Sequence, residues 1–243
     1  MKTARRQFLT AGVTLGITGL VAATPRARGA DPKEAGSPTK EKKEGPADEE
    51  EVSPAEDLMR EHGVLKRIML IYGEALRRME ASEELPPKSL ADAARIIRSF
   101  IEDYHSKLEE DYLFPRFRKA RKLVELVNVL QEQHQAGRRL TDVTLRLATA
   151  EALQSPEDRR ALAESLRQFV RMYSPHEARE DTVLFPAFHE IVSAHEYGAL
   201  GEDFEKREHE LFGKDGFEEM VGRVAGIERG LGIFDLSQFT PHS

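Results

Sequence analysis

The chain has 243 residues, of which 40% are hydrophobic and 33% are charged, and its formal net charge is −7. This length allows one sizeable domain with flexible ends, or at most two small domains. Cysteine is absent, which excludes disulfides, zinc–thiolate sites and iron–sulfur clusters held by cysteine. A bound metal would therefore need nitrogen and oxygen ligands. No strongly basic stripe follows the N-terminal segment, so we expect no nucleic-acid partner.

The segment 1–29 resembles an export signal. An Arg5-Arg6 pair precedes an uncharged run from Ala11 to Ala23. This run has the length of a signal-peptide core and is short for a transmembrane helix. The arginine pair is similar to that of twin-arginine signals, which implies the twin-arginine export machinery as a partner. A periplasmic or secreted protein, folded before export and without a membrane span after processing, is then expected. An uncleaved membrane anchor is the alternative.

Residues 30–53 are rich in proline, glycine, lysine and glutamate, and they contain almost no large apolar side chain. Such a segment cannot bury a core, so we expect a disordered linker. Order is predicted to begin at Pro54, because Ser53 can cap a helix whose first position is proline.

Four stretches with apolar residues three or four apart follow, near residues 58–76, 97–112, 123–141 and 162–183. This spacing is typical of amphipathic helices. Breaks are predicted at Pro86-Pro87, at Pro115 and at Ser155-Pro156. The sequence therefore predicts an all-α fold, an up-down antiparallel four-helix bundle over residues 54–190.

Beyond the bundle, residues 193–212 and a shorter segment that ends near Arg229 are predicted to be helical. The apolar tail of residues 231–239 is expected to pack back on the bundle. We therefore predict residues 191–243 to be a helical extension of the same domain and not a second domain.

One phrase occurs twice in the sequence. His105 and Glu109 are four residues apart, as are His176 and Glu180, and a Leu-Phe-Pro step follows each pair. On a helix this spacing places imidazole and carboxylate about one turn apart on the same face. A further histidine precedes each copy, His62 before the first and His134 before the second. The separation between these two histidines is almost the same as the separation between the two copies.

All four histidines and at least one of the two glutamates occupy positions that otherwise hold leucine, isoleucine or phenylalanine. A buried unpaired carboxylate would destabilise the fold by several kcal/mol, so a compensating charge is expected. Imidazole with carboxylate suits iron, manganese or zinc, and six ligands exceed the four of one structural zinc. We therefore predict two metal ions held by His62, His105, Glu109, His134, His176 and Glu180.

Several neighbours of these ligands have predicted roles of their own. Glu177 could supply an extra carboxylate to one ion. Glu110 and Asp181, rotated about 100° from the glutamates of the repeated phrase, are predicted to support the ligands or face solvent. Pro175 lies inside the fourth stretch, where a kink could aim His176 at the metal.

The two Leu-Phe-Pro steps are predicted to pack and to end their helices. Phe114 and Phe185 are expected to close the apolar wall of the site.

The repeated phrase, with the two preceding histidines, resembles the signature of hemerythrin-like proteins, also described as HHE cation-binding domains, over about residues 54–190. The resemblance implies a four-helix bundle around a non-haem di-iron centre. It pairs His62 with His105 and His134 with His176, and the two glutamates bridge. Oxygen-carrying members have a second histidine four residues before the third-helix ligand, where this chain has Leu130.

The leading hypothesis is thus an exported, non-catalytic di-iron protein that binds or senses dioxygen or another diatomic or peroxide ligand. Manganese and zinc are the alternative metals. The residues leave open a di-iron oxidoreductase acting on peroxide, nitric oxide or oxygen, with Tyr104, Tyr112 or Tyr173 assisting proton or electron transfer. They also leave open an interaction module whose metal is structural.

Overall fold

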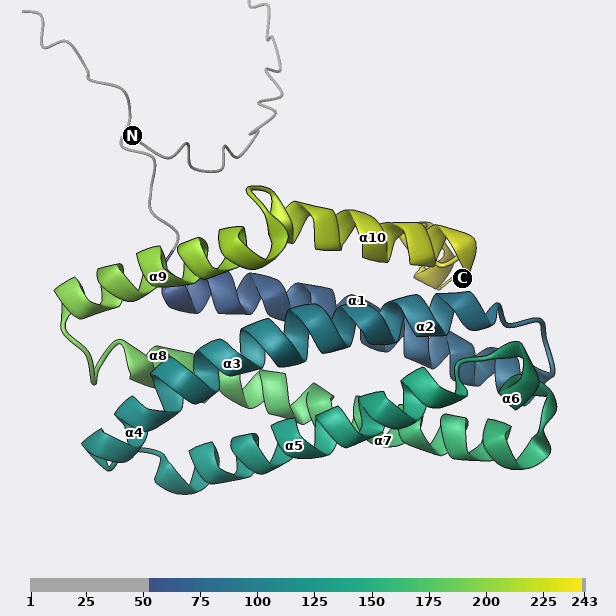
Figure 1. Cartoon of the computed structure of the whole chain (residues 1–243), viewed down its shortest axis with the longest axis horizontal. Helices are drawn as coiled ribbons and strands as arrows, with labels where there is room; N and C mark the ends of the chain where they lie inside the picture. The colour runs from purple at the N-terminus through teal and green to yellow at the C-terminus, as the bar shows by residue number, and fades with distance from the viewer. Residues whose placement is uncertain (1–52, 242–243) are drawn as a thin grey trace, which may run out of the picture. The chain divides into compact units, whose positions relative to one another are not determined.

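The structure, a computed structural model, describes residues 53–241, and this part of the chain is helical without a β-strand (Figure 1). The predicted export signal and most of the predicted linker lie outside the described residues. None of the helices between residues 53 and 241 is both long enough and apolar enough to cross a membrane.

The first helix, α1 (Pro54–Ala81), begins where the sequence predicts. The backbone N–H of Glu56 donates to the Ser53 hydroxyl at 3.3 Å, and the N–H of Ser53 donates to the Glu56 carboxylate at 3.0 Å. This reciprocal pair is a capping box, and it satisfies two backbone donors that a helix start leaves without partners. The helix ends at Ala81 and is capped by Ser82, which adopts a left-handed conformation.

The second long helix runs from Pro87 to Ala120, so the predicted break at Pro115 is wrong. It comprises α2 (Pro87–Ile96), η1 (Ile97–His105), α3 (Ser106–Leu108), η2 (Glu109–Leu113) and α4 (Phe114–Ala120), of which η1 and η2 are π-helical. The N–H of Phe114 donates to the carbonyl of Glu109, five residues back. A proline ring clashes with the carbonyl four residues back in an α-helix. The wider π-turn before Pro115 offers relief from this clash, so the helix continues.

The second half of the bundle repeats this plan. Its third helix, α5 (Val124–Leu147), is followed by the short α6 (Ala150–Gln154). The fourth consists of α7 (Pro156–Arg179), the π-helical η3 (Glu180–Leu184) and α8 (Phe185–Phe188). Ser155 caps α7 as predicted, since its hydroxyl accepts the N–H of Asp158 at 3.3 Å. The α7 helix continues through Pro175.

The four long helices alternate in direction and enclose one core (Figure 1). α7 packs on both α1 and α5, and the second helix packs on the same two partners from the other side. This ring of neighbours confirms the predicted all-α bundle.

The C-terminal segment adds α9 (Ala194–Phe212), which packs along α1, and α10 (Gly216–Gly230), which packs on α1 and α2. A bidentate ion pair fixes α10 to α1, because Arg67 donates to both carboxylate oxygens of Glu228, at 2.9 and 2.5 Å.

The expectation that the tail of residues 231–239 packs back on the bundle is wrong for most of its length. Leu231 is buried, but the chain then turns at Gly232, which has a φ of 71°. Beyond this turn Leu236 and Phe239, the first and last residues of the 3₁₀ turn η4 (Leu236–Phe239), are 77% and 56% exposed. Apolar composition alone does not specify packing where the chain has left the core surface.

One glycine is required by a close contact inside the core. A Cβ on Gly137 of α5 would lie 2.2 Å from the hydroxyl of Tyr173 on α7. The ring of Tyr173 is buried and fills the space that this glycine leaves.

We predict that Gly137→Ala destabilises the protein by about 1–3 kcal/mol, since the added methyl group must displace a fully packed ring. Gly73→Ala is the matched control, because Gly73 is also helical and its Cβ would meet no atom within 4 Å. That control should be neutral or stabilising by about 0.5–1 kcal/mol. Chemical denaturation of the two variants measures the difference. Equal unfolding free energies would contradict the packing argument.

Candidate metal centre

Six side chains predicted from the repeated phrase converge in the middle of the bundle. Each of them is at most 3% exposed. They come from all four long helices: His62 from α1, His105 and Glu109 from the second helix, His134 from α5, His176 from α7 and Glu180 from η3.

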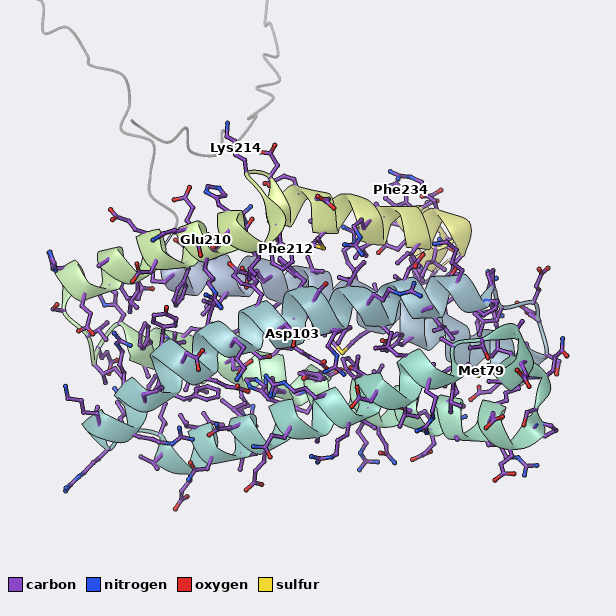
Figure 2. The ribbon with its side chains drawn as sticks, in the orientation of Figure 1. Met79, Asp103, Glu210, Phe212, Lys214 and Phe234 are labelled. Carbon is purple, nitrogen blue, oxygen red and sulfur yellow. The ribbon has the colours of Figure 1, made fainter. Side chains whose placement is uncertain are left out.

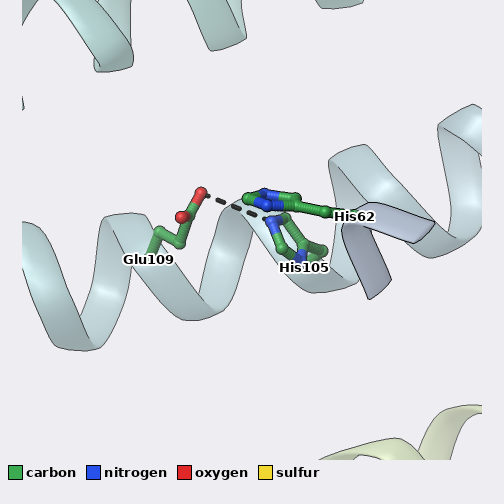
Figure 3. Close-up of side chains that lie close together, drawn as sticks. All are labelled: His62, His105 and Glu109. Atoms are coloured by element: carbon green, nitrogen blue, oxygen red, sulfur yellow. Dashed lines mark ion pairs between the residues drawn. The ribbon is translucent and has the colours of Figure 1, made fainter. Parts of the chain in front are cut away.

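One group of three consists of His62, His105 and Glu109 (Figure 3). One potential ligand atom of each lies within 4.8 Å of the other two. The two imidazole rings are 4.8 Å apart between centroids, and Nε2 of His105 lies 3.7 Å from Glu109 Oε2. We call this group the first triad.

The second triad is its counterpart in the other half of the chain, and it consists of His134, His176 and Glu180. The imidazole centroids are 5.0 Å apart, and Nε2 of His176 lies 3.1 Å from Glu180 Oε1. The structure thus groups the residues in the pairs that the family resemblance implies.

Each glutamate also contacts the opposite triad. Glu109 Oε2 lies 3.3 Å from His134 Nε2, and Glu180 Oε2 lies 3.3 Å from His62 Nε2. Both carboxylates therefore lie between the two triads, where a group bridging two ions would be.

Four hydrogen bonds from imidazole Nδ1 atoms surround the six side chains. In the first triad His62 Nδ1 lies 2.7 Å from Asp181, and His105 Nδ1 lies 2.7 Å from Glu61. A carboxylate accepts, so Nδ1 donates, and in the neutral imidazole Nε2 then carries the lone pair, directed toward the centre.

The second triad has the same arrangement. His134 Nδ1 donates to Glu110 at 3.1 Å, and His176 Nδ1 donates to Gln133 at 2.8 Å. From the sequence, Glu110 is predicted either to support a metal ligand or to face solvent. The structure places its carboxylate against the imidazole of His134. Glu61 and Gln133 were missed, although one stands directly before His62 and the other directly before His134.

The carboxylates set the protonation of two imidazoles. Burial alone would lower the pKa of His62, but its hydrogen bond with Asp181 and the nearby negative charge of Glu180 outweigh burial and raise the pKa to about 10. The corresponding carboxylates raise the pKa of His134 to about 9. By contrast, burial lowers the pKa of His105 and His176.

The pKa values of the two central glutamates are shifted in opposite directions. Burial and the charge of Glu180 raise the pKa of Glu109 to about 7. Burial also opposes ionisation of Glu180, but His176 and His62 keep its pKa well below the usual range. Without a cation, the centre must therefore compensate its own charges with protons.

The centre contains polar atoms that the protein leaves unsatisfied. Within residues 53–241, all four carboxylate oxygens of Glu109 and Glu180 and the Nε2 of His134 are buried without a hydrogen-bond partner. Leaving such groups unpaired destabilises a fold by about 1–3 kcal/mol each. Two divalent cations, each bound by imidazole nitrogen and carboxylate oxygen, would satisfy these groups together. The residues thus fit a two-metal site.

π-helical segments flank the ligands. His105 is the last residue of η1, Glu109 is the first of η2 and Glu180 is the first of η3. Turns of this type are rare and occur frequently at functional sites. The sequence did not predict them, because the apolar spacing of a short π-turn resembles that of an α-helix.

Two phenylalanines of the Leu-Phe-Pro steps cover the imidazoles. The ring of Phe185 stacks on His62 at 5.5 Å, and that of Phe114 stacks on His134 at 5.5 Å. This confirms the predicted apolar wall. Leu130, at the place where oxygen-carrying hemerythrins have a histidine, is 1% exposed.

Glu177 does not join either triad. Its carboxylate is buried and lies 3.8 Å from Lys66 Nζ, and burial raises its pKa to about 7. Of Tyr104, Tyr112 and Tyr173, which were predicted to assist proton or electron transfer, Tyr173 lies against the site. The centroid of its ring is 5.1 Å from that of His176.

Comparison with known proteins agrees with this geometry. The family model described as the hemerythrin HHE cation binding domain matches residues 53–152 and 126–230, and each range contains one His-x-x-x-Glu step. The chain belongs to the hemerythrin HHE family. Members of this family bind cations, and the clustered histidines and glutamates fit a metal site.

Similar proteins occur in mycobacteria. Chains of Mycobacterium tuberculosis (strain ATCC 25618 / H37Rv) and Mycobacterium bovis, both named as uncharacterized proteins, are 52% identical to this chain over 196 residues. The aligned part covers 81% of this hemerythrin-family chain and 77% of each relative. No solved structure matches the chain.

We predict that Asp181→Ala and Glu110→Ala each lower metal affinity by about 10–100-fold, because the imidazole then loses the acceptor that orients it. Competition with a chromophoric chelator measures the affinity. Asp111→Ala is the control, since Asp111 is an exposed acid next to Glu110. Affinities equal to that of the parent chain would show that these acceptors do not support the site.

Proposed function

We propose that this protein holds a non-haem di-iron centre and binds or senses dioxygen, or a related diatomic or peroxide ligand, without turnover. One observation carries the proposal. Two His-His-Glu triads face each other in the core, and each shares its glutamate with an imidazole of the other. A buried donor set of nitrogen and oxygen with two shared carboxylates favours a pair of transition-metal ions.

The chain would contribute ligands, orientation and protection. The iron would be held by His62, His105, Glu109, His134, His176 and Glu180. Two histidines and a carboxylate per ion leave coordination positions free, a pattern typical of non-haem iron that reacts with oxygen. When bound, iron supplies the electrons that a dioxygen ligand requires. Phe114 and Phe185 lie against the imidazoles and exclude water from that side.

Elemental analysis after anaerobic reconstitution tests this proposal. We expect two iron ions per chain, and about one or none in a Glu109→Ala variant. His189→Ala should retain both, because His189 is exposed and outside the triads. An optical band that appears on exposure to air or azide would report ligand access. A metal content well below two per chain, or saturation by manganese or zinc in preference to iron, would contradict the proposal.

A di-iron oxidoreductase is the second candidate, and Tyr173 favours it. Its hydroxyl is buried, has no hydrogen-bond partner among the described residues, and belongs to a ring in contact with His176. A phenol at this place could pass an electron or proton to the centre. Steady consumption of hydrogen peroxide that Tyr173→Phe abolishes would favour catalysis. A centre inert to azide, peroxide and oxygen would favour an interaction module with a structural metal.

We also propose that the protein is exported folded, through the twin-arginine pathway, to the periplasm or cell exterior. The support is the Arg5-Arg6 pair with its following apolar run, together with a buried metal site that is best filled before export. Replacing both arginines by lysine should retain the protein in the cytoplasmic fraction. Unchanged fractionation of this variant would count against the pathway.

A further inference from the structure

The bundle encloses the centre, so a metal ion has to pass between side chains to reach it. Side chains fill the space between the four long helices (Figure 2), and most of the buried ones are apolar. A divalent cation does not cross such a core unaided, because it would lose its water ligands with nothing in exchange. The centre therefore requires a polar path from the surface.

One such path leads to the first triad between α1 and the fourth long helix. Asp181 accepts from His62 through one oxygen and from Lys66 Nζ, at 3.1 Å, through the other. Three carboxylates accept from imidazoles of the centre, and the side chain of Asp181 is the most exposed of them. It is 24% exposed, against 7% for Glu110 and 1% for Glu61.

Glu177, four residues before Asp181, faces the same lysine. Its Oε1 lies 3.8 Å from Lys66 Nζ, whereas its Oε2 is buried and has no hydrogen-bond partner among the described residues. The charges of His62 and Glu180 both act on this carboxylate. Glu177 therefore lies between the surface lysine and the ligands of the centre.

The other half of the chain shows that the repeat does not require this carboxylate. Ser106 follows His105 at the place where Glu177 follows His176, and Ser106 is buried as well. A buried carboxylate with an unsatisfied oxygen destabilises a fold, whereas a serine hydroxyl carries no charge. The first half avoids this destabilisation, so Glu177 has a role other than packing.

Lys66 provides a positive charge at the place that an incoming cation would occupy. Its ammonium group lies against both Asp181 and Glu177, and its side chain is 50% exposed. Ion pairs of such an exposed lysine are weak, because water competes for the charge. A divalent cation can displace the ammonium group and gain two carboxylates, which are suitable oxygen ligands for it.

We propose that Glu177 and Asp181 form the entry site of the metal centre, a transient site for one divalent cation on its way to the triads. The two carboxylates replace water ligands of the ion at the surface, and Lys66 closes the site between passages. This inference rests on the proposed two-metal centre and adds the route by which that centre is filled.

Binding kinetics distinguish an entry site from a ligand of the resident metal. An entry site lowers the barrier that the ion crosses in both directions. Its loss therefore slows binding and release by the same factor and leaves the dissociation constant unchanged. Loss of a resident ligand weakens the equilibrium affinity instead. Asp181 also orients His62, so its variants would change both quantities, and the test uses Glu177 and Lys66.

The experiment adds Co²⁺ to the full chain, freed of metal by a chelator, in a stopped-flow instrument. Co²⁺ stands in for Fe²⁺, which it neighbours in the order of affinity for nitrogen and oxygen ligands. Quenching of tyrosine fluorescence reports its arrival, since the chain has no tryptophan and Tyr173 lies against His176. Transfer of bound Co²⁺ to a chromophoric chelator measures release.

We expect Glu177→Gln to take up and release Co²⁺ about 10-fold more slowly than the parent, with an unchanged dissociation constant. Lys66→Gln should take up Co²⁺ several-fold faster, because the competing charge is gone. Two matched controls should keep the parent rates. Glu164→Gln removes an exposed acid from the same helix as Glu177, and Lys107→Gln removes the lysine that pairs with Glu110 in the other half.

An unchanged uptake rate in Glu177→Gln would overturn the proposal, and so would equal uptake rates in Lys66→Gln and Lys107→Gln. A weaker equilibrium affinity of Glu177→Gln at an unchanged uptake rate would make Glu177 a resident ligand and would also overturn it. Thermal unfolding checks the variants, and half-exposed Lys66 gives a readout even if Glu177→Gln unfolds. Cobalt analysis at equilibrium separates the two proposals, because a parent chain that takes up no Co²⁺ would overturn the central site as well.

Discussion

Charge buried in the middle of the bundle is the constraint on which the rest of the structure depends. Glu109 and Glu180 lie where water cannot reach them and where no hydrogen bond satisfies them within the described residues. The acceptors at the four Nδ1 atoms direct each Nε2 inward, toward these carboxylates. Aromatic rings then cover the imidazoles. Each feature is compatible with a stable fold if positive charge lies between the triads, and each would destabilise the fold without that charge.

The two halves of the centre are equivalent in plan but differ in chemistry. Asp181, the acceptor of His62, pairs with Lys66, which lies four residues after that histidine. In the same way Glu110, the acceptor of His134, pairs with Arg138, four residues after His134. The acceptors of the other two imidazoles, those of His105 and His176, are not equivalent. A carboxylate accepts from His105, whereas the amide of Gln133 accepts from His176. A carboxylate makes its imidazole the more basic ligand, so the two metal positions are not identical.

The sequence predicted the helices and the six central residues because both depend on spacing. Apolar periodicity marks the helices, and the repeat places the same residue types in the same core positions. Other features depend on geometry that spacing does not encode. The π-turn before Pro115 allows the second helix to continue, and the apolar periodicity of the sequence does not indicate such a turn. Glu61 and Gln133 are rotated away from the apolar stripe, so in the sequence they resemble solvated surface. Leu236 and Phe239 look like core residues, yet the turn at Gly232 leads the chain away from the bundle.

Thermal unfolding with and without metal tests the central claim most directly. If cations compensate the buried carboxylates, removing metal with a chelator should lower the melting temperature, and two equivalents per chain should restore it. Binding at 100 times the dissociation constant corresponds to about 2.7 kcal/mol of added stability per ion, which is a shift of several degrees. A melting temperature that is the same for the metal-free and metal-loaded chains would contradict the account.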